Sequence, residues 1–198
     1  MFRVVAHLLC LAPLGRLIWL GTHAGLTANP VQFVQDKLGD WGLNFLVLTL
    51  CMTPAARLTK DSRWIQIRRA VGLYAFFYAS LHFLSWLWLD KEFDWGEMFA
   101  DIEKRRWILV GFSSLVLMVP LAVTSTKGWI RRLGKNWGRL HRLTYPAAVL
   151  AGVHYLWQVK LDRRWPEFYL AAIAALLLWR VWHKAVTRPL QTPRRAET

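Results

Sequence analysis

The sequence predicts an all-α integral membrane protein with six transmembrane helices, and three observations lead to that prediction. Of the 198 residues, 55% are hydrophobic and 13 are tryptophans. Apolar stretches of nearly membrane-spanning length recur along the whole chain. Lys and Arg gather in the short gaps between these stretches, a pattern that reports orientation in a membrane. Because this pattern explains the net charge of +14, no nucleic-acid partner is expected.

Six apolar segments mark the expected helices, which together form one domain over residues 1–198. They cover residues 4–21, 41–56, 70–89, 107–124, 143–159 and 166–182. The first begins like a signal peptide but continues without a convincing cleavage site, so we interpret it as a retained helix. Several segments are short at about 1.5 Å of rise per residue, so interfacial Trp and Tyr must complete each span. No internal repeat is evident in the sequence.

The charges of the loops predict the orientation of the chain. The second and fourth loops are basic, and so is a short tail at residues 184–198. The first loop, residues 22–40, holds Lys37 as its one Lys or Arg, and the third loop, residues 90–106, is rich in Asp and Glu. Since Lys and Arg favour the cytoplasmic side, we expect the basic loops and both termini in the cytoplasm. The first and third loops are then periplasmic.

Two histidines lie deep inside apolar segments, His82 in the third and His154 in the fifth. Both helices are expected to run outward from the cytoplasm, which places His82 about 18 Å and His154 about 17 Å from the cytoplasmic start. An ionisable side chain in a bilayer is costly and usually marks a function. The alternative is a purely structural role, in which each histidine hydrogen-bonds a neighbouring helix as a packing contact. Two imidazoles at one depth on parallel helices favour the two axial ligands of a haem.

An inner site near the cytoplasmic edge is suggested by Arg68 and His141. Arg68 lies about four turns before His82, on roughly the same helix face. One histidine with arginine neighbours suits a cofactor that carries carboxylates or phosphate, although the same residues can serve only as cytoplasmic anchors. Arg16, inside the first segment, either snorkels toward the periplasmic surface or pairs with a haem propionate.

Four stretches of the sequence resemble a known family. They are GLTANPVQ after the first segment, TPAAR at the end of the second, RRAVGLYAFFYASLH in the third, and the block TSTKGW, LGKNW and LHRLTY that leads into the fifth. Together they resemble the MsrQ family, formerly YedZ, of the ferric-reductase-like transmembrane superfamily. The resemblance covers almost the whole chain.

The resemblance implies a haem held between the third and fifth helices in the bacterial inner membrane. Family members draw electrons from the quinone pool, with a flavin reductase and FMN also implicated. They pass them through b-type haem to a periplasmic molybdopterin enzyme that reduces methionine sulfoxide in oxidised envelope proteins. The family's haem histidines correspond to His82, His141 and His154, and its paired arginines to Arg68 and Arg69. The resemblance implies one haem at His82 and His154, and it leaves the inner site to a second haem, a flavin or quinone.

Two other classes of function compete with an electron carrier. A small transporter or channel could use the histidines as a proton relay, but intramembrane acids are scarce and the lack of a repeat argues against it. A membrane scaffold with structural histidines would bind no cofactor. Only about fifteen residues follow the sixth segment, too few for a folded domain, and no GxGxxG turn occurs. We therefore expect electrons from quinone or from a separate protein, and no substrate-reducing site in this chain.

Overall fold

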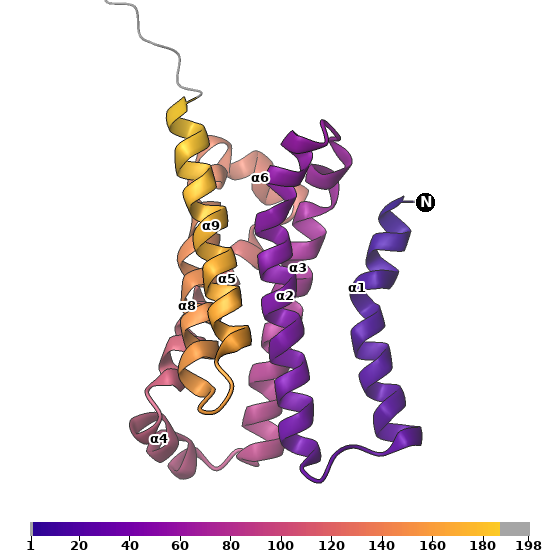
Figure 1. Ribbon diagram of the computed structural model, residues 1–198, viewed down its shortest axis with the longest axis vertical. Helices are drawn as coiled ribbons and strands as arrows, with labels where there is room; N and C mark the ends of the chain where they lie inside the picture. Colours follow the sequence, from indigo (N-terminus) through magenta and orange to yellow (C-terminus); the bar gives the residue numbers. More distant parts are fainter. Residues whose placement is uncertain (1, 187–198) are drawn as a thin grey trace, which may run out of the picture.

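Residues 2–186 are described by the computed structural model, and every regular element in that range is a helix. The long helices stand side by side as a bundle, with α1 at one edge and the short α4 at one end (Figure 1). In chain order the helices are α1 (Phe2–Trp19), α2 (Pro30–Leu58), α3 (Arg63–Ser85), α4 (Trp95–Lys104), α5 (Trp107–Val123), α6 (Lys127–Leu133), α7 (Lys135–Leu140), α8 (Thr144–Gln158) and α9 (Arg164–Val186). Short π-helical turns follow α1 and α3, and a 3-10 turn, η3 (His141–Leu143), precedes α8.

Four helical stretches are long and apolar enough to cross a membrane, which makes the chain a multi-pass membrane protein. They are Phe2–His23, Pro30–Leu58, Arg63–Asp90 and Arg164–Val186. A fifth crossing results if α4 and α5, bent by 107° relative to each other, count as one broken span. Helix α8 has 15 residues, so its axis is about 22 Å long and shorter than a typical bilayer core. The six-span count and the cytoplasmic position of both termini therefore stay predictions.

Helix α2 begins at Pro30, whereas the apolar pattern placed its start near residue 41. The Asn29 side chain accepts a hydrogen bond of 3.1 Å from a backbone N–H of the first turn, and proline is favoured at that place in a helix. Lys37 and Asp40 form an ion pair of 3.1 Å. Because these charges interrupt the apolar run, the sequence pattern did not predict this part of the helix. The predicted first loop is therefore mostly helix, and the added turns hold one of the candidate histidines in place, as described below.

The predicted third loop contains the amphipathic helix α4, whose first turn is capped by the Asp94 side chain. Just before it, the Lys91 side chain is only 6% exposed. Its Nζ lies 2.8 Å from both Glu97 and Asp101 and 3.6 Å from Asp90. Burial alone would lower the pKa of Lys91, but these carboxylates raise that pKa well above its ordinary value. The charges thus tie α4 to the end of the preceding helix, and this segment is more ordered than a loop.

Close helix approach and one tyrosine hold the first three helices together. A Cβ added at Gly42 of α2 would lie 3.2 Å from the backbone nitrogen of Ala79 of α3, so a small residue lets the two helices approach closely. The buried Tyr78 hydroxyl donates to the Cys10 carbonyl (2.9 Å) and accepts from the Leu14 N–H (3.1 Å) of α1. Tyr78 of α3 therefore bonds two backbone groups of one turn of α1 and links the two helices.

The predicted basic tail at residues 184–198 lies mostly outside the described residues. Helix α9 continues through Lys184 to Val186, so the first part of the predicted tail is helical.

Candidate functional site

The two histidines predicted to pair face each other inside the bundle. His82 comes from α3 and His154 from α8, and their ring centroids lie 6.2 Å apart with the ring planes at 73°. Both side chains are half-buried. The structure therefore brings together the two imidazoles that were matched by depth in the sequence; we call them the histidine pair.

Both imidazoles are fixed in the same tautomer. The Nδ1 atom of His82 lies 2.9 Å from the carbonyl oxygen of Gln35 in α2, and that of His154 lies 2.8 Å from the carbonyl of Trp107 in α5. A carbonyl oxygen can only accept a hydrogen bond, so each Nδ1 carries the proton. Each Nε2 is then left with its lone pair, and this is the arrangement by which backbone carbonyls orient metal-binding histidines.

Each ring packs against a glycine of the neighbouring helix. A Cβ added at Gly111 would lie 2.6 Å from the Nδ1 of His154, and one added at Gly39 would lie 3.1 Å from the Nδ1 of His82. Distances below 3.0 Å are essentially never seen for real Cβ atoms, so Gly111 is required for the observed position of His154. At Gly39 a side chain would crowd the ring less severely.

The α2–α3 hairpin and the α5–α8 hairpin carry the same arrangement. Each histidine bonds a carbonyl that lies 47 residues earlier in the chain, and each glycine stands four residues after that carbonyl. The two helix pairs therefore share a local correspondence that the sequence does not display, because it consists of backbone carbonyls and glycines. It is limited to these three positions in each pair, so the transporter alternative must be judged on the site itself.

The histidine pair has the dimensions of an axial ligand pair. With metal–imidazole bonds of about 2.0 Å and roughly 1.1 Å from each nitrogen to its ring centre, two imidazoles on opposite sides of one metal ion have centroids roughly 6.2 Å apart. Within residues 2–186 no cluster of three or more His, Cys, Asp or Glu side chains could hold a metal ion. Two ligands suit a haem iron, because the macrocycle supplies the other four nitrogens.

Arg68 and His141 lie at the other end of the same hairpins. Arg68 donates to the Thr53 hydroxyl at 3.0 Å. The Nε2 of His141 lies 3.1 Å from the Thr124 hydroxyl, and its ring stacks on Trp137 at a centroid distance of 3.9 Å. Burial, and then the positive charge of Arg68, lower the pKa of His141. The predicted inner residues are thus close enough to interact.

A second arginine, Arg180 of α9, completes what we call the inner cluster: Arg68, His141 and Arg180. The Arg180 guanidinium donates to the Leu50 carbonyl (2.6 Å) and to the Tyr145 hydroxyl (3.0 Å), and its charge acts on Arg68. Its Nε is buried without a hydrogen-bond partner. Among residues 2–186 no carboxylate pairs with either arginine. Two guanidiniums facing only neutral groups suit a phosphate or carboxylate ligand.

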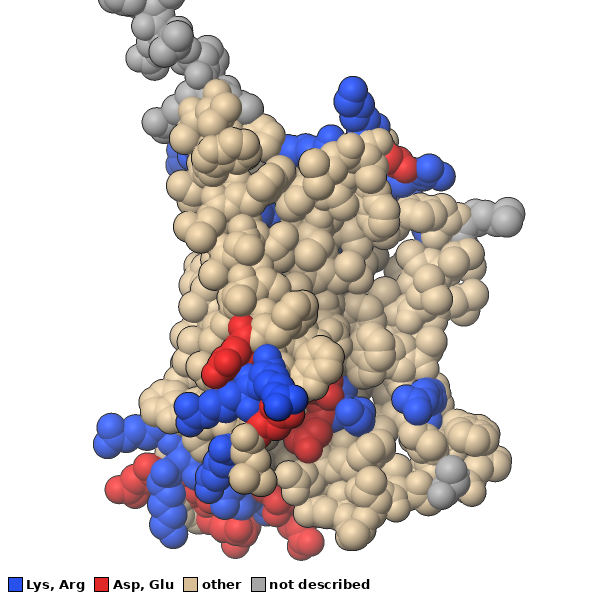
Figure 2. All heavy atoms as spheres, in the orientation of Figure 1, with Lys and Arg blue, Asp and Glu red and all other residues tan. Residues whose placement is uncertain are grey.

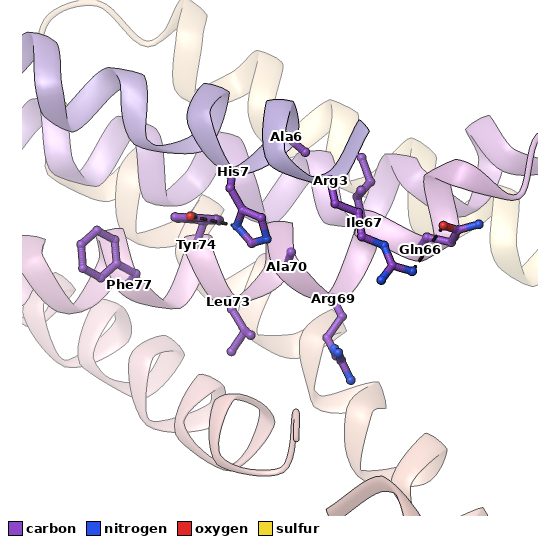
Figure 3. Close-up of a pocket in the computed structure, with 10 residues that line it drawn as sticks. All are labelled: Arg3, Ala6, His7, Gln66, Ile67, Arg69, Ala70, Leu73, Tyr74 and Phe77. Atoms are coloured by element: carbon purple, nitrogen blue, oxygen red, sulfur yellow. Dashed lines mark hydrogen bonds between the residues drawn. The ribbon is translucent and has the colours of Figure 1, made fainter. Parts of the chain in front are cut away.

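The structure separates the paired arginines and leaves Arg16 apart. Arg69 is one residue beyond Arg68, so it points about 100° further around the helix. There it lines a cleft between α1 and α3 that also contains Arg3 (Figure 3). Arg16 is exposed on α1 and makes no hydrogen bond or ion pair within the described part of the chain. Cofactor binding by Arg69 and by Arg16 stays a prediction.

Sequence reasoning missed three contributors to these sites. Gln35 and Trp107 act through backbone carbonyls, which leave no mark in a sequence. Arg180 did leave a signal: it is a charged residue inside the sixth apolar segment, and such a residue is costly in a bilayer and marks a functional site by default.

Comparisons with known proteins give consistent matches. Residues 38–152 match the family model described as the ferric reductase like transmembrane component. The chain is 45% identical over 192 residues to the protein-methionine-sulfoxide reductase heme-binding subunit MsrQ of Xanthomonas euvesicatoria pv. vesicatoria, covering 94% of this chain and 88% of that protein. It is 46% identical over 187 residues to the protein of the same name from Caulobacter vibrioides, covering 94% and 89%. It is 42% identical over 200 residues to the protein of that name from Xanthomonas oryzae pv. oryzae, covering 98% of this chain and 92% of that protein.

Proposed function

Because this chain belongs to the MsrQ family of haem-binding subunits, within the ferric-reductase-like transmembrane proteins, we propose that it is a transmembrane electron carrier whose b-type haem is held by His82 and His154. The single observation that carries the proposal is the histidine pair. Its ring centroids are 6.2 Å apart, and each Nδ1–H is held by a backbone carbonyl. The two lone pairs belong to rings whose centroid separation matches that of two ligands on one metal ion, and this separation favours ligation over a proton relay.

The residues of this chain would orient the ligands and limit the chemistry. Gln35 and Trp107 hold the imidazoles through their carbonyls, and Gly39 and Gly111 leave room for the rings. When bound, a haem with two imidazole ligands supplies one-electron redox chemistry at an iron that has no open coordination position. The chain would therefore pass electrons without activating oxygen or reducing a substrate of its own.

The direction of transfer follows from the proposed orientation. Six spans with both termini in the cytoplasm place the inner cluster on the cytoplasmic side and the histidine pair in the periplasmic half. In Figure 2 acidic and basic side chains are mixed at the end where α4 lies, whereas the charges visible at the opposite end are nearly all basic. Because Lys and Arg without acidic neighbours are typical of the cytoplasmic side, we propose that the end away from α4 is the cytoplasmic one.

The inner cluster is the proposed entry point for electrons. Quinol or a reduced flavin would dock near Arg68 and His141, and Arg180 would bind an anionic group such as the phosphate of FMN. A second haem, with His141 as a ligand and the arginines on its propionates, is the other occupant that this chemistry allows. A cytoplasmic flavin reductase would renew the flavin.

The proposed electron acceptor is a periplasmic molybdopterin methionine-sulfoxide reductase that repairs oxidised envelope proteins. The relatives are named as heme-binding subunits of protein-methionine-sulfoxide reductase, which supports a partner enzyme. We propose a one-to-one complex with it in the bacterial inner membrane. The α4 end, with its exposed acidic side chains, is the surface that we propose for docking.

A reconstitution experiment tests this function. The detergent-purified protein is mixed with a chemically reduced quinol analogue, or with reduced FMN, and haem reduction is followed by its visible spectrum. We expect rapid reduction, followed by reoxidation only when the reductase partner and a methionine-sulfoxide peptide are both added. A haem that neither donor reduces, or that the partner cannot reoxidise, would refute the proposed path.

A further inference from the structure

The cleft between α1 and α3 is separate from both sites described above. It has a volume of about 490 Å³ and contains residues from the first turns of both helices. Arg3, Gln66 and Arg69 lie toward one end and Phe77 lies at the other, with His7 and Tyr74 between them (Figure 3). None of the residues that line it belongs to the histidine pair or to the inner cluster.

The polar end of the α1–α3 cleft carries two positive charges without counter-ions. Arg3 makes one hydrogen bond of 3.4 Å, to the neutral side chain of Gln66. Arg69 makes no hydrogen bond or ion pair with any residue between 2 and 186. No carboxylate lines the cleft, and its remaining polar pair is His7 with Tyr74, at 3.0 Å. A ligand here must bring negative charge to two guanidiniums.

The other end of the cleft is apolar and is reached along a single helix face. Arg69, Leu73 and Phe77 stand at spacings of four residues, so they follow one another on one face of α3. Both apolar side chains are exposed to more than a third. The outward face of α1 is apolar as well, for example at Leu8 and Leu9, so the cleft opens toward lipid in a membrane. Arg3 and Arg69 lie at the basic end of the bundle, and Leu73 and Phe77 lie further along α3, away from that end.

We propose that the α1–α3 cleft binds an anionic phospholipid of the cytoplasmic leaflet. Its phosphate lies between Arg3 and Arg69, and an acyl chain runs along Leu73 and Phe77. Basic pockets between transmembrane helices on the cytoplasmic side are known as lipid headgroup sites. A neutral quinone ring would leave the two guanidiniums without a counter-charge, and a soluble phosphate would leave the apolar wall uncovered. The lipid would also fill the cleft between α1 and α3.

The test measures lipid binding directly and needs no haem or flavin signal. The purified protein is titrated with phosphatidylglycerol, with phosphatidylcholine and with inorganic phosphate, and bound lipid is counted by native mass spectrometry. We expect retained phosphatidylglycerol and at least a tenfold preference over phosphatidylcholine. Arg3→Gln should weaken phosphatidylglycerol binding, and the double variant Arg3→Gln/Arg69→Gln should weaken it roughly tenfold or more.

A matched control separates the cleft from general basic attraction. Arg131→Gln/Arg132→Gln removes two exposed charges of α6, and we expect unchanged lipid preference. Equal losses in the two double variants, or no preference for phosphatidylglycerol, would overturn the proposal. So would displacement of the lipid by an uncharged quinone analogue, which would assign the cleft to quinone. Because bound lipid is counted directly, a failure here is distinguishable from a failure of the haem assignment.

Discussion

The outer and inner ends of the two hairpins differ in symmetry. At the outer end, α2–α3 and α5–α8 each contribute one carbonyl, one glycine and one histidine, in the same spacing. At the inner end, Arg68 of the first hairpin contacts the Thr53 hydroxyl, whereas His141, just before α8 in the second, contacts the Thr124 hydroxyl. Arg180 then enters from a third element, α9.

This difference indicates two kinds of ligand. A haem iron has two equivalent axial positions, so it is suited to two equivalent imidazoles. The inner cluster is unequal and rich in unpaired positive charge, so it is suited to an anionic group with no twofold symmetry. Under the proposed function, the two hairpins would hold two different redox partners, one at each end.

Removing one ligand of the histidine pair is expected to give the largest effect. His82→Ala or His154→Ala should weaken haem binding by roughly 100-fold or more, since loss of a partner that only orients a ligand already costs about 10–100-fold. Haem per chain is measured by pyridine haemochrome. The control is His23→Ala, an exposed histidine whose contacts are with its neighbours Trp19 and Thr22, and it should keep its haem.

Substitutions of Gly39 and Gly111 test whether the two rings of the histidine pair are packed equally closely against their glycines. Gly111→Ala should lower haem affinity by roughly 10–100-fold, because the new methyl group displaces the His154 ring, whereas Gly39→Ala should have a smaller effect. Gly15→Ala is the control, because nothing lies within 4 Å of the added methyl. Haem titrations of the three variants give the order, and equal affinities would show that the rings are not held as described.

Removing the second arginine of the inner cluster tests which ligand the cluster binds. Arg180→Gln should weaken FMN binding roughly 10- to 150-fold, because hydrogen bonds to a charged group contribute roughly 1.5–3 kcal/mol. The haem spectrum should not change. Arg57→Gln is the matched control, because Arg57 lies near the same end but contacts the Trp179 ring. Quenching of FMN fluorescence reports the affinities. A haem deficit in Arg180→Gln alone would assign the cluster to a second haem.

The smallest effect on haem binding is expected at Lys91, beside α4. Lys91→Met should lower the local stability of α4 by about 1–2 kcal/mol, because Asp101 loses its buried partner while two of the three carboxylates are partly exposed. Hydrogen exchange of the α4 amides measures this, with Lys104→Met at an exposed position as control. Haem affinity should change less than about twofold; a larger loss would extend the outer site to α4.

The sequence predicted the histidine pair because polar residues inside apolar segments are conspicuous and because helix direction follows from loop charges. It could not predict what orients the rings. Those partners are backbone carbonyls and glycines, and one set lies in the turns of α2 that Lys37 and Asp40 disguise as loop. The inner cluster was half predicted: Arg68 and His141 approach each other, but Arg69 points elsewhere because adjacent helical residues lie about 100° apart. Arg180 was overlooked although its charge within an apolar segment was visible.

The most direct test of the central claim is the visible spectrum of the detergent-purified protein, oxidised and dithionite-reduced, with haem counted by pyridine haemochrome. We predict a low-spin b-type spectrum with one haem per chain, lost in His82→Ala. Two haems per chain would place His141 on iron as well. No Soret band when haem is supplied during expression, or a full haem complement in His82→Ala, would contradict the account.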